Sequence, residues 1–203
     1  MLALVAAYLV GSVPTGFIVA RLAGLDDIRR HGSGNIGATN VLRTLGWQPG
    51  LAVLLLDAAK GMAGVLLVRW AAGGPEWQAL GGLLSMAGHM WPVWLRFQGG
   101  RGVATGIGVL LALDPLAAAV AALVFVAVVA VSRYVSLGSI SAALPGVVVL
   151  GLRGASWPEL AITGVCAATI IWRHRPNIQR LLAGQENRFS LRSKTPTTSP
   201  PLA

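Results

Sequence analysis

Charged residues are scarce in this chain. Only 11% of its 203 residues are Asp, Glu, Lys or Arg, whereas 55% are hydrophobic, and the mean hydropathy is +0.69. A soluble globular domain carries about 25% charged residues. The composition therefore excludes an ordinary soluble domain and indicates an integral membrane protein, with a length that suits one membrane-embedded domain of several helices.

Acidic residues are scarcer than basic residues. Seven Asp and Glu stand against sixteen Lys and Arg, which leaves a formal net charge of +9. In a soluble protein this excess would suggest nucleic acid, but in an apolar chain it favours cytoplasmic loops that face anionic lipid, or an anionic substrate. We expect membrane lipid, and no nucleic acid, as a partner.

Cysteine and histidine are too few and too scattered for a disulfide or a metal cluster. Cys166 is the only cysteine and lies in an apolar run, so we interpret it as a small buried hydrophobic residue. The three histidines have no metal-ligand spacing. We expect no metal and no cofactor.

The N-terminus lacks the basic region that precedes the apolar run of a signal peptide, so residues 2–20 are predicted to be the first membrane helix. Further apolar runs predict helices at about 51–70, 77–95, 103–113, 116–131, 140–152 and 159–172. This all-α arrangement has about seven transmembrane helices, some of them short or broken. Residues 1–190 are predicted to form a single domain, and the Pro- and Thr-rich tail, 191–203, to be disordered.

The basic residues sort by side under this topology. One set of connections, together with the C-terminal tail, carries nearly all of them, while the opposite set carries only Arg69 and Arg153. The positive-inside rule then places the N-terminus outside and the C-terminus in the cytoplasm. Tryptophans near both ends of the predicted spans agree with an interfacial aromatic belt.

A glycine-rich segment, residues 31–46, interrupts the apolar pattern with HGSGNIGATNVLRTLG. Its backbone groups would be unpaired in hydrocarbon. Gly32, Gly34 and Gly37 are predicted to adopt positive φ, and successive N–H groups in such a loop bind phosphate well. The formal G-x-G-x-x-G match lacks the βαβ context of a dinucleotide site, and no Walker lysine follows.

Four more polar clusters fall on the same predicted side as this loop. They are residues 11–16, 99–102, 136–141, and 174–177 with Glu186. The 99–102 cluster precedes a short predicted helix, whose free N–H groups and dipole favour an anion. Glycine loops, arginines and hydroxyls at one face together predict a site for a phosphate-bearing ligand.

Two polar features fall inside the predicted spans. Asp57 and Lys60 lie three residues apart, on one helix face. Charges inside a membrane are costly and usually functional, although a self-neutralising structural pair explains them equally simply. For His89 the alternatives are a packing histidine and a functional one.

The sequence contains no arrangement typical of covalent acyl transfer by serine, histidine and carboxylate. The histidine–four residues–aspartate motif of many glycerol-phosphate acyltransferases is also absent, because Ile36, Trp94 and Gln179 stand five residues after the three histidines. An acyltransferase of this sequence would belong to a different kind.

Taken together, these motifs resemble the bacterial acyl-phosphate:glycerol-3-phosphate acyltransferase family (PlsY-type). The matching stretches follow the family's order over nearly the whole chain: GSVPTGFIVARL (11–22), GSGNIGATNVLRTLG (32–46), LDAAKG (56–61), GHMWPVWLRFQGGRGVATGIGVLL (88–111), SLGSISA (136–142) and HRPNIQRLLAGQENRF (174–189).

The resemblance implies a multi-pass enzyme of the bacterial inner membrane with a cytoplasmic active site. It would transfer an acyl group from acyl phosphate to the sn-1 hydroxyl of glycerol 3-phosphate, giving lysophosphatidic acid and phosphate, the first step of bacterial phospholipid synthesis. Neither coenzyme A nor acyl carrier protein would be the direct donor.

The resemblance also assigns residues. The expected catalytic residues are Ser33, His174, Asn177 and Glu186. The expected substrate-binding residues are Gly32, Ser33, Gly34, Asn35, Gly37, Thr39, Asn40, Arg43, Gly99, Gly100, Arg101, Gly102, Ser139, His174 and Asn177. Arg101 stands where the family usually has lysine; arginine keeps the charge but differs in reach and geometry.

The implied chemistry is physically consistent with these residues. An acyl phosphate is already activated, so the protein has to hold two anions together and stabilise charge. The attacking hydroxyl also needs a proton acceptor, either His174 as general base or a phosphate oxygen of the donor. We favour the phosphate oxygen, with His174 and Asn177 orienting glycerol 3-phosphate and the acyl chain between helices, open to lipid.

Two other classes of protein share some of these features. A transporter of a small phosphate compound would share the basic site and broken helices, but it predicts polar residues on both faces, and the outer connections here are short and less polar. A purely structural membrane protein leaves the glycine loop unexplained.

Overall fold

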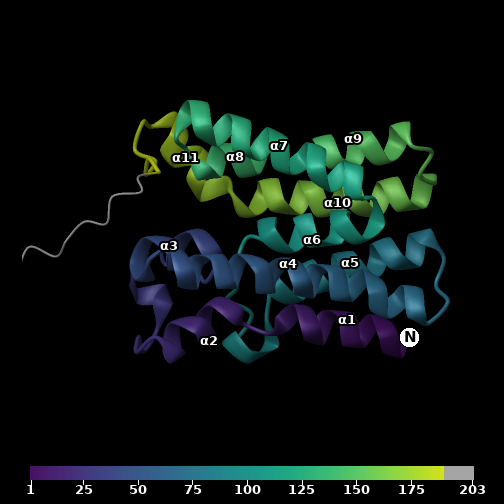
Figure 1. Cartoon of the computed structure of the whole chain (residues 1–203), viewed down its shortest axis with the longest axis horizontal. Helices are drawn as coiled ribbons and strands as arrows, with labels where there is room; N and C mark the ends of the chain where they lie inside the picture. Colours follow the sequence, from purple (N-terminus) through teal and green to yellow (C-terminus); the bar gives the residue numbers. More distant parts are fainter. Residues whose placement is uncertain (190–203) are drawn as a thin grey trace, which may run out of the picture.

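The computed structural model describes residues 1–189, and every regular element within that range is a helix (Figure 1). The all-α prediction is confirmed for this range, while the tail 191–203 lies outside the described residues. In chain order the elements are α1 (Leu2–Ser12), α2 (Thr15–Leu22), η1 (Ile28–Arg30), α3 (Ala38–Leu45), α4 (Trp47–Trp70), α5 (Pro75–Met90), η2 (Val93–Leu95), α6 (Val103–Leu113), α7 (Pro115–Ser132), α8 (Val135–Ser141), α9 (Pro145–Leu152), α10 (Trp157–Arg173) and α11 (Arg175–Leu182).

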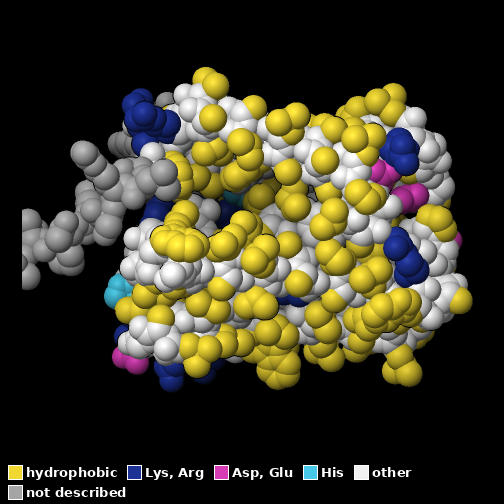
Figure 2. Space-filling model, in the orientation of Figure 1, with side chains coloured by type: hydrophobic (Ala, Val, Ile, Leu, Met, Phe, Trp, Pro, Cys, Tyr) yellow, Lys and Arg dark blue, Asp and Glu magenta, His cyan; other side chains and the backbone are white. Residues whose placement is uncertain are grey.

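The long helices lie side by side as roughly parallel rods, with the N-terminus at one end of the bundle and α11 at the other (Figure 1). Hydrophobic side chains cover the flank seen in Figure 2, and most charged side chains gather toward the two ends. Four stretches are long and apolar enough to cross a membrane, and α6 is a shorter apolar helix; the four are Leu2–Leu22, Trp47–Trp70, Pro115–Ser132 and Val135–Leu152. The count of seven spans and their orientation stay predictions.

The first predicted span is broken where its sequence contains proline. Pro14 has no N–H to continue the helical ladder, so α1 ends at Ser12 and α2 begins at Thr15. The break frees the carbonyl of Val13, which accepts a hydrogen bond from Lys60 Nζ at 3.0 Å. The polar cluster at 11–16 therefore breaks the first helix.

Helix α4 is the centre of the bundle and packs against α1, α3, α5 and α6. Glycines allow the closest of these approaches: a Cβ on Gly61 would collide with the carbonyl of Thr105 on α6, and one on Gly108 with the carbonyl of Ala58. Small residues at such crossings let helix backbones approach within van der Waals contact.

The core has two parts. Around α5, α6 and α10 it consists of Val65, Met86, Met90, Val109, Ala143, Cys166, Ala167 and Ile170, so the prediction that Cys166 is a buried hydrophobic residue is confirmed. The second part, Ala20, Ile28, Ile36, Val41, Val53 and Leu95, lies beneath the glycine-rich loop and supports it from below.

Several predicted boundaries differ from the observed ones at prolines. The 103–113 helix is as predicted, but the 77–95 run ends at Met90, because Pro92 restricts the residue before it to extended backbone. The helix predicted at 140–152 corresponds to α9, which begins only at Pro145, while α8 begins at Val135, five residues before the predicted run. Proline is well placed at the start of α9 because its missing N–H belongs to the unpaired first turn.

The short α-helices α3 and α11 were not predicted. Their segments were interpreted as parts of polar loops. Each buries a polar side chain, Asn40 in α3 and Asn177 in α11. A hydropathy reading misses helices whose buried residues are polar.

Candidate anion-binding site

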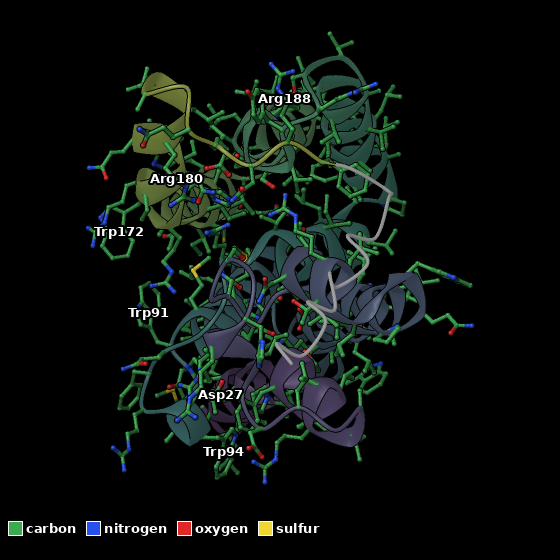
Figure 3. The ribbon with its side chains drawn as sticks, turned by 90° about the vertical axis from the view of Figure 1, so that its left-hand side faces the viewer. Asp27, Trp91, Trp94, Trp172, Arg180 and Arg188 are labelled. Atoms are coloured by element: carbon green, nitrogen blue, oxygen red, sulfur yellow. The ribbon has the colours of Figure 1, made fainter. Side chains whose placement is uncertain are left out.

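Three of the predicted polar clusters meet at one end of the bundle (Figure 3). They surround a cavity of about 260 Å³ lined by Ser33, Gly34, Asn35, Gly99, Arg101, Trp172, Arg173, Arg175 and Pro176. The loop before α3, the turn before α6 and the α10–α11 junction thus form one site. Trp91 and Trp172 lie along the same edge of this end, with ring centroids 6.2 Å apart (Figure 3).

Asn40 shapes the glycine-rich loop from inside. Its Nδ2 donates to the carbonyls of Ile28, His31 and Asn35 at 3.3, 3.0 and 2.8 Å, and its Oδ1 accepts from the N–H of Ser33 at 2.7 Å. The side chain is only 1% exposed. We therefore revise the substrate-binding prediction for Asn40: it positions the loop and does not line the cavity.

The glycines of this loop do not all have the predicted conformation. Gly32 and Gly34 have φ of +58° and +72°, as expected. Gly37 does not: its φ is −75°, so the prediction of positive φ there is wrong. Its N–H donates to Asn35 Oδ1 at 2.7 Å, which closes the turn into α3. Thr39, in the first turn of α3, is half-buried and does not line the cavity.

The turn 99–102 is held by its neighbours on both sides. The N–H groups of Gly99 and Gly100 donate to the carbonyls of Met90 and His89 at 3.2 and 3.0 Å, so they are not free to bind an anion as predicted. Gly102 has φ of +81° and leads into α6, whose first N–H groups have no helical partner. The anion-binding capacity of the turn therefore rests on Arg101 and the start of α6.

Arg101 is the cation of this turn, and it is half-buried. Among residues 1–189 its guanidinium has no hydrogen-bonding partner, although it lines the cavity. Burial, together with the nearby positive charges of Arg180, Arg173 and Arg43, lowers the pKa of Arg101 to about 10, so it remains charged at neutral pH. An unpaired cation among other cations strongly favours an anionic ligand.

Arg173 is a site residue that the sequence analysis missed. Its Nη2 donates to the carbonyls of Gly99 and Gly100 at 3.1 and 2.9 Å, and its Nε to Gly100 at 3.2 Å. The guanidinium also lies over the Trp91 ring, 5.7 Å from its centroid. The only sequence signal is its position in the run Arg173–His174–Arg175.

His174 lies behind the cavity wall and is 2% exposed. Its Nδ1 lies 2.8 Å from the carbonyl oxygen of Ile170. Because a carbonyl only accepts, Nδ1 carries the proton and Nε2 is left with a free lone pair. Burial and the positive charges of Arg101 and Arg173 lower the pKa of His174 to about 4, so the ring is neutral at pH 7.

Glu186 fastens the C-terminal segment to the site. Its carboxylate accepts from Asn177 Nδ2 at 2.8 Å, Arg180 Nε at 2.7 Å and Ser136 Oγ at 3.1 Å. Burial raises the pKa of Glu186, but these three hydrogen bonds outweigh it and hold the pKa below its usual value. Glu186 thus holds Asn177, whose buried Oδ1 has no partner among residues 1–189, and its catalytic role stays a prediction.

Ser139 and Arg43 are further predicted binding residues that do not line the cavity. Ser139 Oγ donates to the Val135 carbonyl at 2.9 Å, and the residue lines a separate apolar cavity of about 40 Å³ between α6, α8 and α10. Arg43, on α3, is exposed, with its Nη2 3.5 Å from the carbonyl of Asn187. The structure thus brings Ser33, Gly34, Asn35, Gly99 and Arg101 together at the cavity, and keeps Ser139 apart.

Comparison with known proteins matches this chain along nearly its whole length. Residues 1–184 match the family described as glycerol-3-phosphate acyltransferase. A glycerol-3-phosphate acyltransferase 2 of Moorella thermoacetica is 53% identical, covering 95% of this chain and 99% of its own length. A glycerol-3-phosphate acyltransferase of Desulforudis audaxviator is 52% identical, covering 91% and 93%.

Solved structures agree with the sequence relatives. The crystal structure of PlsY (YgiH), an integral membrane glycerol 3-phosphate acyltransferase, in its glycerol 3-phosphate form has a TM-score of 0.88 and 42% identity, covering 93% of this chain and 94% of that chain. Its lysophosphatidic acid form has a TM-score of 0.86 and 41% identity, covering 94% and 95%. The chain described here is accordingly a multi-pass membrane protein that belongs to the glycerol-3-phosphate acyltransferase family.

Proposed function

We propose that this protein transfers an acyl group from acyl phosphate to the sn-1 hydroxyl of glycerol 3-phosphate, releasing lysophosphatidic acid and inorganic phosphate. The observation that carries the proposal is the unpaired Arg101 guanidinium in a cavity of about 260 Å³ bordered by the glycine-rich loop. The similar PlsY crystal structures, described as glycerol 3-phosphate and lysophosphatidic acid forms, support the same pair of substrate and product.

The main difficulty of this reaction is to bring two anionic substrates together. The positive charges at this end of the bundle reduce the repulsion between them. Arg101 lines the cavity, and Arg43 and Arg173 add positive charge nearby. Helix α6 begins two residues after Arg101, and the N–H groups of its first turn have no helical partner and would attract an anion. The hydroxyl of Ser33, on the cavity wall, is a further donor for a phosphate oxygen.

The reacting hydroxyl is oriented by two acceptors in this proposal. The free Nε2 of His174 and the buried Oδ1 of Asn177 are both unprotonated and suited to accept hydrogen bonds from the glycerol hydroxyls. The hydroxyl oxygen bonds to the acyl carbonyl carbon while the bond from that carbon to the phosphate oxygen breaks. The hydroxyl proton leaves with the phosphate.

A phosphate oxygen is the better proton acceptor of the two alternatives. Accepting the proton would make His174 a buried cation beside Arg101 and Arg173, and its pKa of about 4 reflects first the burial and then those positive charges. The departing phosphate carries negative charge, which the same arginines stabilise. His174→Gln with near-normal turnover would exclude His174 as the base.

The proposal also places the protein in the bacterial inner membrane, with the cavity on the cytoplasmic side and the acyl chain between helices. Acyl phosphate, and neither coenzyme A nor acyl carrier protein thioester, is the direct donor. The donor follows from the family resemblance, and the orientation follows also from the distribution of basic residues.

A reconstitution assay tests the proposed reaction. The purified protein, supplied with palmitoyl phosphate and glycerol 3-phosphate, is expected to form lysophosphatidic acid, and palmitoyl coenzyme A is expected to give none. Arg101→Gln should lower kcat/KM about 100-fold by leaving a substrate phosphate without its charge partner. A folded sample without product, together with counterflow of labelled glycerol 3-phosphate in liposomes, would instead indicate a transporter.

A further inference from the structure

A buried charged cluster lies beneath the site, and the mechanism above does not use it. Asp57 and Lys60 on α4 and His89 on α5 are 1%, 5% and 4% exposed. Asp57 Oδ1 lies 2.8 Å from Lys60 Nζ and 3.5 Å from His89 Nδ1, and it accepts a hydrogen bond from Thr15 Oγ1. None of these side chains lines the anion cavity.

One side of the cluster contacts the 99–102 turn. The carbonyl of His89 accepts the N–H of Gly100 at 3.0 Å. The imidazole itself lies against the same residue, because a Cβ added to Gly100 would collide with three atoms of the ring. The position of the His89 ring therefore fixes the height of the turn that presents Arg101.

The other side of the cluster holds the entry to the glycine-rich loop. Lys60 donates to the Val13 carbonyl at the α1–α2 break, and Thr15, the first residue of α2, donates to Asp57. The next residue, Gly16, packs so closely on the carbonyl of Ile36 that a Cβ would not fit. Ile36 belongs to the loop that carries Ser33.

We propose that Asp57, Lys60 and His89 form a brace that sets the position of the two anion-binding segments relative to each other. Asp57 and His89 are then positioning residues for the reaction proposed above, on which this inference rests. Self-neutralisation explains Asp57 and Lys60 but not why the carboxylate also faces His89 and Thr15. A buried ion pair adds little net stability, because desolvation offsets the attraction between its charges, and fixing the positions of neighbouring segments is the role proposed for it here.

Kinetic analysis of Asp57→Asn and His89→Gln tests the brace. With palmitoyl phosphate and glycerol 3-phosphate, each is expected to lower kcat/KM about 100-fold, mainly through KM for glycerol 3-phosphate, because a displacement of about 1 Å has that effect. Asp114→Asn is the matched control, since Asp114 pairs with Arg153 at the opposite end. Because Arg153 is largely exposed, the Tm of this control should fall less than those of the two variants, and its kinetic constants should stay unchanged.

The outcomes separate the two proposals. An inactive wild-type protein would overturn the proposed reaction itself. An active wild-type protein whose Asp57→Asn and His89→Gln variants keep constants within about twofold would overturn the brace alone. Should either variant fail to fold, Thr15→Val, which removes only the hydroxyl on Asp57, is expected to raise KM several-fold; an unchanged KM would equally overturn the brace.

A double-variant cycle tests the contact between His89 and Gly100. Gly100→Ala alone should abolish most activity by displacing the turn. In the His89→Ala background the ring is absent, so adding Gly100→Ala should cost no further activity. Additive losses would show that the ring does not position the turn.

Discussion

At the scale of single residues, three polar side chains form hydrogen bonds within the chain and so position the groups that surround the cavity. They are Asn40, Arg173 and Glu186. Asn40 holds the loop of Ser33, Arg173 holds the carbonyls of Gly99 and Gly100, and Glu186 holds Asn177. Each leaves a neighbouring group free for a ligand. Substitutions at these residues should therefore change catalysis without removing a substrate contact.

Arg173→Lys should lower kcat/KM about 10-fold or more, since a single ammonium does not reproduce the planar fork that reaches both glycine carbonyls. Steady-state kinetics with both substrates measure the change. The control is Arg153→Lys, at the opposite end of the bundle, which should keep wild-type constants. Equal kinetics for wild type and Arg173→Lys would contradict the assignment.

The stability difference between wild type and Glu186→Gln should depend on pH in a defined direction. The folded-state pKa of Glu186 lies below its usual value of 4.5. Its contribution is therefore fully present above that value and is lost as pH falls through the folded pKa. At pH 7 the free energy of unfolding of wild type should exceed that of the variant by about 2 kcal/mol, which is typical of hydrogen bonds to an ionised group.

Unfolding of wild type and Glu186→Gln in detergent, at pH 7 and at successively lower pH, measures that difference. It should narrow below pH 4.5, where the carboxylate begins to protonate. A difference that stays constant with pH would mean that ionisation of Glu186 does not stabilise the fold.

Residue roles were only partly predictable from the sequence. The positive φ of Gly32 and Gly34 and the burial of Cys166 follow from residue chemistry alone. The use of the Gly99 and Gly100 amides by α5 does not, because their acceptors are carbonyls nine and eleven residues earlier in the chain, which only the fold brings close. Arg173 was missed for the same reason: its partners are backbone atoms, which leave no mark in a sequence.

At the scale of helices, apolar runs located the long elements and prolines located their ends. Hydropathy predicts where a chain is buried in lipid, so α4, α6 and α7 were found with small boundary shifts. It says nothing of helices that bury polar side chains, so α3 and α11 were missed. The glycines within the predicted spans allow close contact between helices where the helices cross.

Gly61→Ala should destabilise the α4–α6 crossing by about 1–3 kcal/mol, since its Cβ collides with the Thr105 carbonyl and the helices have to separate. Gly164→Ala is the matched control: its Cβ on α10 meets no atom within 4 Å, and alanine favours a helix. Thermal unfolding in one detergent compares the two. A Tm for Gly61→Ala equal to that of the control would contradict close packing at this crossing.

At the scale of the whole molecule, the charged end that carries the cavity and the end that carries the N-terminus are chemically distinct. The cavity end holds Arg43, Arg101, Arg173, Arg175 and Arg180, while the connections at the other end hold Arg69 and Arg153. The positive-inside rule predicts that the cavity end faces the cytoplasm. That orientation is open to a direct test.

Single-cysteine labelling should report this orientation. In a Cys166→Ser background, Ala71→Cys at the end of α4 should react with a membrane-impermeant maleimide from outside intact cells. Gln185→Cys, beyond α11, should react only after permeabilisation. The reverse pattern would invert the topology.

The cavity wall is built from distant parts of the chain. Ser33 and Arg101 come from its first half, and Arg173 and Arg175 come from near its end. During synthesis the first of these segments enters the membrane long before α10 is made. An incomplete chain thus has the glycine loop and Arg101 but lacks the arginine that clamps the turn and the histidine behind it. Activity should consequently appear only with completion of the polypeptide, and membrane-inserted fragments cut before α10 should be inert by themselves.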